Sequence, residues 1–375
     1  YDPADPPSML PESEPTSLHG LMLDYADDLF EMLQADGSTT SSTVTPVYVT
    51  LGTHVENQLP LPCGPAPNER CCGEYERFRA NLITYADLFL DYGVAWNLQP
   101  NQELLRLTDA CETDALRDAT TGGKSIIPFL IEDKSVMVDP HCHPHEGDNY
   151  ADVMETLRLH GAPEEMLTVV GGCYTGEPGQ LETLEAGWEG DAFPDVVWRP
   201  SLLTFPALVG HPVDGEDYTS GMWKPSAFDY NPLAGQAGEG YYTHDPQRRI
   251  AMVGSGFVHS CALGHDEASF YYASDYIEAL VSHLRSGQAP PDQLFTATIA
   301  TNQQHMNDPD TYLEHVKAQL VALQDEVKAG EVIYTHYQDL PAVWTEQYSG
   351  EPNIYPLDAF DRTEYTCDGE GNRVP

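Results

Sequence analysis

The stretch Val47-Tyr-Val-Thr-Leu-Gly-Thr-His-Val55 indicates most clearly how this chain folds. It is rich in β-branched residues and is bounded by turn-forming residues, a pattern typical of a strand. A helical stripe of apolar residues follows over 75–92, and then come Gly93, a helix-stop residue, and the apolar run Val94–Leu98. The stretch therefore predicts the opening strand of a strand–helix–strand unit.

Strand and helix patterns continue to alternate along the rest of the chain. The expected strands are 126–131, 136–138, 167–170, 196–198, 250–253, 294–300 and 332–335, and the expected helices are 150–159, 269–284 and 309–328. Alternation of this kind predicts an α/β fold with a parallel sheet. About seven or eight strands in a single run favour a closed barrel over an open sheet.

The ends of the chain and one internal stretch differ in composition from this body. Residues 1–45 are expected to be an N-terminal tether with one short helix, because 2–15 is rich in Pro, Glu, Asp and Ser. The Gly- and Pro-rich stretch 206–249 has weak periodicity and is expected to be a long loop insertion. The barrel is expected over 46–348, and 349–375 is expected to be a C-terminal tail.

The formal net charge is −43, from 60 acidic and 17 basic residues. Nucleic-acid phosphates would be repelled by such a surface, so we expect no nucleic-acid partner. No run of eighteen apolar residues is present, so we expect no membrane span. The acidic surface is explained by the solubility of an exported protein, or alternatively by binding of divalent cations to carboxylates.

The eight cysteines contain no C-x-x-C pair. An even number of scattered cysteines suggests disulfides and an oxidising compartment, although eight cysteines allow 105 pairings. We therefore expect a secreted, periplasmic or cell-surface protein. The sequence opens at Tyr1 with no signal-like segment, so the signal would be absent from the sequence shown.

The histidine-rich segment Asp139-Pro-His141-Cys-His143-Pro-His145-Glu-Gly-Asp148 directly follows the expected strand 136–138. Imidazole is a preferred ligand of zinc and similar metals. In an extended chain His141, His143 and His145 point to one side, and in a helix His141 and His145 meet at i, i+4. The alternative is a surface loop that binds metal only adventitiously. The C-terminal end of a strand, where barrel sites gather, favours a metal site.

A second polar pair, His54 and Glu56, ends the first strand. Residues at i and i+2 of a strand share one face, so both side chains would point into the same space. Glu56 would complete a metal site or take a proton from metal-bound water. The alternative is an ordinary polar strand end.

Two further residues follow expected strands. His336 ends the last one, where an imidazole can protonate a leaving group, and the alternative is a structural histidine. Arg199 follows 196–198, where it can hold a carboxylate by two hydrogen bonds, and the alternative is a surface arginine stacked on Trp198.

The order of these motifs over roughly 47–348 resembles the polysaccharide deacetylase (NodB-homology) superfamily. The resemblance implies a distorted (β/α)7-type barrel, here with a long loop insertion and disulfides. It implies that His141 and His145 are the paired metal histidines, that Arg199 belongs to an arginine motif, and that His336 is the general acid.

The chain departs from the T-F-D-D signature of that superfamily, which is replaced by Thr53-His-Val-Glu56. The resemblance then implies that His54 or Glu56 takes the place of the metal-binding and base aspartates. The candidate ligands are therefore His54, Glu56, His141, His143 and His145.

These observations predict a metal-dependent hydrolase that uses a divalent ion, most simply zinc, to activate water. A carboxylate, Glu56 or Asp148, would accept the proton of the water, and His336 would protonate the departing group. The resemblance implies an N- or O-acylated carbohydrate as substrate.

Two alternatives remain open at this point. One is a non-catalytic exported barrel that binds a glycan or a metal, which the replacement of T-F-D-D favours. The other is a metal-dependent phosphoesterase, because Asp139-Pro-His141-Cys-His143 resembles the D-x-H-x-H start of such barrels.

Overall fold

The chain divides into two compact units, Tyr1–Thr43 and Val44–Pro375. The computed structural model describes parts of the second unit only. The described residues are 44–55, 63, 67–142, 148–173, 179–206, 219–227, 230–231, 236–237, 240–255, 270–357, 366–367 and 373–374. The tether and short helix expected before residue 44 lie outside these residues.

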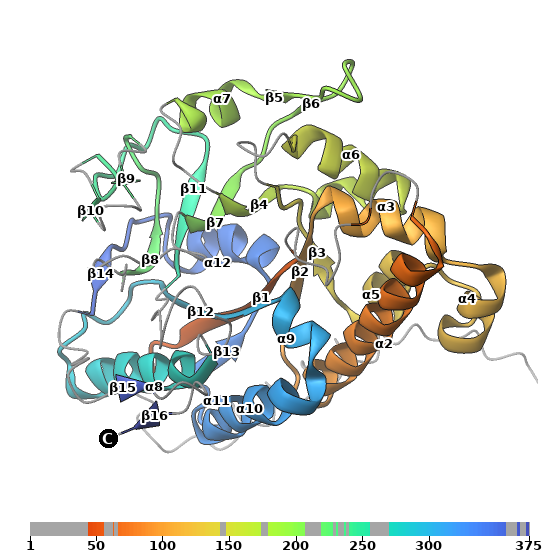
Figure 1. The fold of residues 1–375 in the computed structure, drawn as a ribbon. Coiled ribbons are helices and arrows are strands. Elements are labelled where there is room, and N and C mark those ends of the chain that lie inside the picture. Colours follow the sequence, from red (N-terminus) through yellow and green to blue (C-terminus); the bar gives the residue numbers. More distant parts are fainter. Residues whose placement is uncertain are drawn as a thin grey trace, which may run out of the picture. The chain divides into compact units, whose positions relative to one another are not determined.

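The first of two five-stranded sheets is built around β1 (Val47–Val55) and is entirely parallel (Figure 1). On one side β1 pairs with β12 (Phe295–Asn302). On the other side it pairs with β2 (Trp96–Pro100), which in turn pairs with β3 (Met137–Val138). The short β13 (Val332–Tyr334) pairs with Val47, Tyr48 and Val49 at the beginning of β1. All nine residues of β1 are buried, as expected for a central parallel strand.

The second five-stranded sheet has a parallel half and an antiparallel half. The parallel strands are β4 (Val169–Cys173), β7 (Leu202–Pro206) and β11 (Ala251–Ser255). On the far side of β11, β8 (Thr219–Trp223) runs antiparallel, and β14 (Tyr355–Pro356) pairs antiparallel with β8.

The two sheets are in contact at two places. The backbone N–H of Gly171 in β4 donates to the carbonyl of Pro140, just after β3, at 3.0 Å. Thr296 in β12 donates through Oγ1 to the carbonyl of Gly254 at 2.7 Å and accepts from the N–H of Gly221 at 2.9 Å. The fold class is therefore mixed α/β with mainly parallel strands and helical connections.

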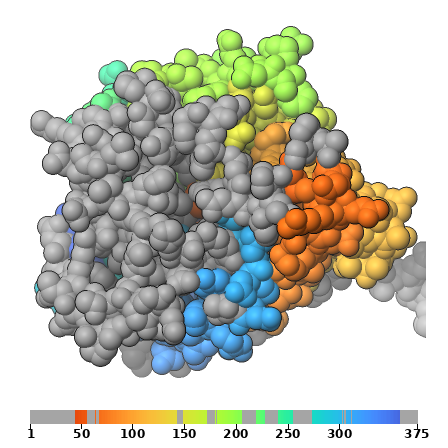
Figure 2. Space-filling model, in the orientation of Figure 1, coloured from red at the N-terminus to blue at the C-terminus, as the bar shows by residue number. Residues whose placement is uncertain are grey.

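Helices follow most of the parallel strands. The longer ones are α2 (Glu69–Asp91), α3 (Gln102–Cys111), α6 (Tyr150–Leu159), α8 (Phe270–Ser286) and α10 (Pro309–Ala322). The remaining short elements are α4 (Asp114–Thr121), α5 (Ile126–Lys134), η2 (Glu164–Met166), α7 (Gln180–Ala186), β5 (Trp188–Glu189), β6 (Val197–Trp198), β9 (Tyr230–Asn231), β10 (Gln236–Ala237), α9 (Gln303–Asn307), α11 (Gln324–Lys328), η4 (Tyr337–Asp339), α12 (Leu340–Gln347), β15 (Thr366–Cys367) and β16 (Arg373–Val374). On the face shown in Figure 2, α2 lies beside α9 and α10. Among the described residues, no helix is long and apolar enough to cross a membrane.

The helix α2 shows why the apolar stripe in the sequence was informative. Phe78, Leu82 and Phe89 recur at helical spacing, and all three are buried. Asn68 caps the first turn by accepting a hydrogen bond from the N–H of Cys71 at 3.0 Å, which satisfies one of the open donors. The expected helix over 75–92 is confirmed, and it begins earlier.

The segment 126–131, expected to be a strand, is instead the start of α5. The Glu112 carboxylate accepts a hydrogen bond from the N–H of Ile126 at 3.1 Å and so caps this helix. Ile126, Ile127 and Leu130 are buried, a spacing that suits one helix face. A short apolar run is compatible with either structure, and here Glu112, the C-cap residue of α3, stabilises the helical one by accepting from its first N–H.

Four other expectations require correction. The strand 196–198 is β6, which pairs antiparallel with β5 and belongs to neither large sheet. The stretch 206–249, expected to be a loop, contains the buried strand β8. The helix expected over 309–328 is broken at Leu323 into α10 and α11. The tail expected from residue 349 begins later, because β14 pairs with β8.

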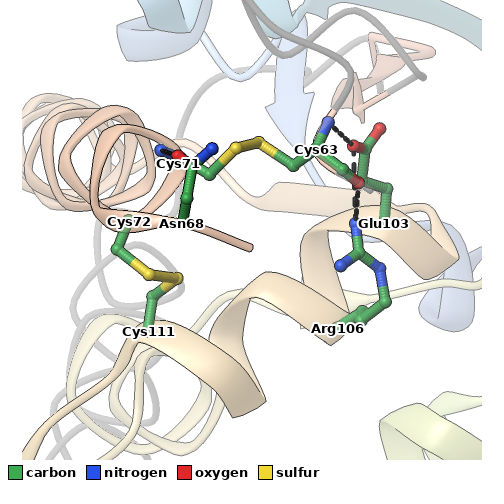
Figure 3. Close-up of a disulfide and its surroundings, with 7 residues drawn as sticks. All are labelled: Cys63, Asn68, Cys71, Cys72, Glu103, Arg106 and Cys111. Atoms are coloured by element: carbon green, nitrogen blue, oxygen red, sulfur yellow. Dashed lines mark hydrogen bonds and ion pairs between the residues drawn. A yellow bond between two sulfur atoms is a disulfide. The ribbon is translucent and has the colours of Figure 1, made fainter. Parts of the chain in front are cut away.

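Two disulfides surround the start of α2, in agreement with the expectation from cysteine number (Figure 3). Cys63 is bonded to Cys71 and Cys72 to Cys111, so that adjacent cysteines hold two different partners. The backbone of Cys63 is also held by Glu103, which accepts from its N–H at 3.2 Å. The chain that follows β1 is thereby attached to both α2 and α3.

Removing the two disulfides is expected to have unequal effects. The Cys72→Ser, Cys111→Ser variant should lose about 4 kcal/mol of unfolding free energy, and the Cys63→Ser, Cys71→Ser variant about 2.5 kcal/mol. The bonds have sequence separations of 39 and 8, and the longer loop restricts the unfolded chain more. Urea unfolding of both variants measures this difference. Equal losses would contradict an origin in loop entropy.

Candidate functional site

His54 occupies the C-terminal end of β1 in the middle of the first sheet. In the strand register it stands between Gln99 of β2 and Asn302 of β12. Its side chain is fully buried. Parallel strands end at a common edge, and this edge is where functional groups of α/β folds gather.

His141 reaches the same edge from the end of β3. The backbone continues to pair with β2 beyond Val138, because the N–H of Asp139 donates to Leu98 O at 3.0 Å. The N–H of His141 then donates to Pro100 O at 3.2 Å. The expectation that strand one and the histidine-rich segment open at one edge is thus confirmed for His54 and His141.

The two imidazoles face each other edge to face. Their ring centroids are 4.7 Å apart at an interplanar angle of 83°, and the Nδ1 atoms are 3.2 Å apart. His141 Nδ1 also lies 2.6 Å from the carbonyl oxygen of Gly171. A carbonyl oxygen only accepts, so this bond requires a hydrogen on Nδ1 of His141 and leaves its lone pair on Nε2.

This orientation of His141 suits a metal ligand. Histidines that bind a metal commonly donate their other ring N–H to a backbone carbonyl, which fixes the tautomer and the ring. Two imidazoles in one buried place are also a donor set that zinc prefers. The chemistry of His54 and His141 therefore fits a bound zinc ion.

Gln99 and Gly171 complete the surroundings of the pair, and sequence reasoning missed both. A Cβ atom at Gly171 would lie 2.6 Å from Cδ of Gln99, so only glycine allows this close approach. The polar residues Asn97 and Gln99 alternate with apolar ones in a buried strand, which was the available signal for them. A glycine in a strand was a second signal, because it often marks close approach of another group.

Asp139 lies beneath this site in a buried amide network. Its carboxylate accepts hydrogen bonds from Asn97 Nδ2 at 2.8 Å and from Gln338 Nε2. Burial raises the pKa of Asp139 to about 7, although the hydrogen bonds from the three amides of Asn97, Gln99 and Gln338 oppose this rise. Asp139 therefore titrates near neutral pH in the folded protein.

The raised pKa of Asp139 predicts a loss of stability as the pH rises. The folded value of about 7 exceeds the ordinary value of 3.8. The contribution of the Asp139 carboxyl to the free energy of unfolding is thus present in full below about pH 4 and is lost as the pH rises toward 7. In chelator-treated protein, the unfolding free energy of Asp139→Asn relative to wild type should rise by on the order of 4 kcal/mol between pH 4 and pH 8. Denaturant unfolding across this range measures the change. The exposed Asp114→Asn is the control, and a parallel response of both variants would contradict the prediction.

Several of the expected ligands fall outside the described residues. Glu56, His143 and His145 lie in 56–62 and 143–147, so their contribution to a metal site stays a prediction. Within the part of the chain that the structure describes, no three His, Cys, Asp or Glu side chains are grouped closely enough to hold an ion. His54 and His141 are thus the two expected ligands that the described residues bring together.

Asp148 lies just before the N-cap residue of α6, Asn149. It lines a pocket of about 430 Å³ whose other walls include Trp188 and Glu189. Burial first, and then the charge of Asp148, raise the pKa of Glu103. The role of Asp148 as a base stays a prediction.

Arg199 lies apart from the histidine pair. Arg199 follows β6 and precedes β7, so it lies near the N-terminal end of a parallel strand, whereas His54 lies at the C-terminal end of β1. The guanidinium stem packs on Gly187, where an added Cβ would lie 3.1 Å from Cγ and Nε of Arg199. A role of Arg199 beside His54 and His141 gains no support from these contacts.

His336 is also separated from the pair. The strand β13 ends beside Val49, which precedes His54 by five residues, or roughly 16 Å of extended strand. His336 Nε2 donates to the carbonyl of Ser135 at 3.1 Å, and Nδ1 is 3.5 Å from the Asp339 carboxylate. The hydrogen bond with His336 lowers the pKa of Asp339. The proposed general-acid role of His336 stays a prediction.

Comparison with known proteins adds no further evidence, since no family model, no curated protein and no solved structure matches this chain. Arguments about function therefore depend on the residues and on their geometry.

Proposed function

We propose that this protein is a metal-dependent hydrolase with its centre at His54 and His141, which removes an acyl group from an N- or O-acylated carbohydrate. The observation that carries the proposal is the buried contact of the two imidazoles, with Nδ1 atoms 3.2 Å apart. Two histidines from different strands meet at the C-terminal edge of a parallel sheet, the usual place for catalytic groups in such folds.

The proposal includes a distorted (β/α)7-type barrel as the scaffold. Four strands of the first sheet, β1, β2, β3 and β12, run parallel to one another, as do three of the second, β4, β7 and β11, and these seven would form the barrel. The hydrogen bond from Gly171 to Pro140 supports an approach of the sheet edges β4 and β3, and the bond from Thr296 to Gly254 supports contact of β12 with the second sheet. In such a barrel, His54 and His141 would open at the same rim.

The residues of the chain would share the work around the metal. His141, oriented by Gly171 O, would present Nε2, and His54 would supply a second nitrogen, with Glu56, His143 and His145 as further candidates. When bound, zinc lowers the pKa of a water toward 7 and polarises a carbonyl. Glu56 or Asp148 would hold the proton taken from that water.

The carbohydrate part of the proposal is supported by the sequence resemblance to polysaccharide deacetylases. The exported location is supported by the two disulfides, which persist in oxidising compartments. The alternatives of a non-catalytic barrel and of a phosphoesterase are tested by the same experiment.

The experiment combines metal analysis with a substrate panel. We expect about one zinc ion per chain in purified protein, and release of acetate from acetylated sugars that stops on treatment with a chelator. Release of phosphate instead of acetate would favour the phosphoesterase. A stoichiometric metal without turnover would favour the binding protein, and absence of metal would contradict the proposal.

A further inference from the structure

Gln99 is the polar side chain that most closely accompanies the histidine pair. It is fully buried and stands next to His54 in the register of β1 and β2. Its side chain packs directly against Gly171, the residue whose carbonyl orients His141. The geometry thus puts an uncharged amide beside both imidazoles.

The orientation of this amide is fixed by two acceptors. Gln99 Nε2 lies 3.4 Å from Asp139 Oδ2 and 3.4 Å from Thr204 Oγ1. The hydroxyl of Thr204 donates its own hydrogen to Val170 O at 3.0 Å, so it can only accept from Gln99. A flipped amide would direct Oε1 at the lone pairs of Thr204 Oγ1 and of the ionised Asp139 carboxylate, which disfavours that arrangement.

The other end of the amide has no partner among the residues that the structure describes. Gln99 Oε1 is a buried atom without a hydrogen bond among the described residues. A buried acceptor left unsatisfied is costly, and such atoms in folded proteins commonly have a functional reason. The atom is an acceptor only, so a ligand that satisfies it has to bring an N–H or an O–H.

We propose that Gln99 Oε1 accepts the N–H of the group that is hydrolysed, so that the site selects N-acyl over O-acyl substrates. The inference rests on the proposed hydrolase function and narrows its substrate class to amides. The atom bonded to the attacked carbonyl carries a hydrogen in an amide, whereas in an ester it is an oxygen with lone pairs. An ester has no hydrogen to donate to Gln99 Oε1. Its oxygen would place a second set of lone pairs against that atom. Sites built around such a hydrogen bond discriminate strongly against analogues that lack the hydrogen.

The matched probes are 4-nitroacetanilide and 4-nitrophenyl acetate, which differ only in N–H against O at the scissile bond. In Gln99→Met we expect kcat/KM for the anilide to fall roughly 10- to 100-fold, while that for the ester stays within about twofold. Differences in the intrinsic reactivity of the probes cancel, because each is compared between variant and wild type.

Gln338→Met is the matched control, since Gln338 is a second amide of the same network with both ends satisfied. Its Nε2 donates to Asp139 and to Met166 O at 3.1 Å, and its Oε1 accepts from Asn97 at 2.8 Å. We expect this variant to unfold at a lower temperature than wild type with an unchanged amide-to-ester ratio. Gln99→Met should unfold near the temperature of wild type, because it removes the unsatisfied acceptor together with two long hydrogen bonds of 3.4 Å to Asp139 and Thr204.

A binding measurement separates failure of this inference from failure of the hydrolase proposal. In chelator-treated protein, calorimetry with the trisaccharide of N-acetylglucosamine should show about tenfold weaker binding to Gln99→Met than to wild type. Equal losses on both nitrophenyl probes, or unchanged trisaccharide binding, would overturn the role of Gln99. If wild type releases acetate neither from these probes nor from acetylated sugars, the hydrolase proposal fails, and the trisaccharide alone then decides whether Gln99 recognises an N-acyl group.

Discussion

His141→Ala is expected to lose its bound zinc and to release acetate about 10³-fold more slowly than wild type. A metal that polarises a carbonyl contributes several kcal/mol to the barrier, and each 1.4 kcal/mol corresponds to a tenfold change in rate. His141 is the proposed ligand whose orientation is best defined, because the carbonyl of Gly171 holds its Nδ1 at 2.6 Å. Zinc per chain by mass spectrometry and kcat/KM on an acetylated sugar measure the two effects.

His54→Ala and His283→Ala give this prediction its controls. His54→Ala should also lower zinc content, because the two imidazoles are in contact. His283 of α8 lies away from the pair, and its Nδ1 is 2.9 Å from the hydroxyl of Tyr355 in β14. Replacing His283 should therefore leave zinc content and kcat/KM near the wild-type values. If His141→Ala keeps stoichiometric zinc and full activity, the metal centre lies elsewhere and the proposed role of His141 is wrong.

The sequence was most informative where one chain segment determines its own structure. The run Val47–Val55 forms a strand because its β-branched residues suit a buried parallel position, and the residues after it form a helix through apolar spacing. His54 and His141 were recognised because His54 lies at the end of one strand and His141 follows another, and parallel strands end at a common edge.

The features that were missed depend on contacts between distant segments. Whether 126–131 forms a helix is decided by Glu112, and the place of β8 in the second sheet is decided by β11 and β14. Gln99 becomes part of the site only because Gly171 of another sheet approaches it. Local periodicity contains no information on these pairings.

Arg199 and His336 show a further limit of reading motifs in order along the chain. Each follows a strand, as the sequence indicated, but the strands differ from the expected ones in pairing. Arg199 follows the antiparallel β6, and His336 follows a strand that pairs only with the beginning of β1. The order of motifs therefore predicted the fold class better than it predicted the composition of the site.

Glu112→Gln is expected to lower the unfolding free energy by about 3–5 kcal/mol. Glu112 and Arg79 form an ion pair at 2.6 Å with only 1% of either side chain exposed. The same carboxylate accepts from the hydroxyl of Tyr75 at 2.9 Å and from the N–H of Ile126 at 3.1 Å. Burial and the charge of Glu112 raise the pKa of Tyr75 well above its usual value, so that its hydroxyl remains a donor.

Glutamine at position 112 would leave the Arg79 guanidinium buried without its counter-charge and would turn an amide N–H toward other donors. The midpoint of urea unfolding, taken at constant slope, gives the loss. The matched control is Glu155→Gln, which breaks the pair with Arg158, where 12% of the Glu155 side chain and 47% of the Arg158 side chain are exposed, and should cost no more than about 1 kcal/mol. The Arg79→Met, Glu112→Met double variant should be more stable than Glu112→Gln, because it removes both charges together. If the Glu112→Gln protein is as stable as Glu155→Gln, the packing of α2, α3 and α5 does not depend on this ion pair.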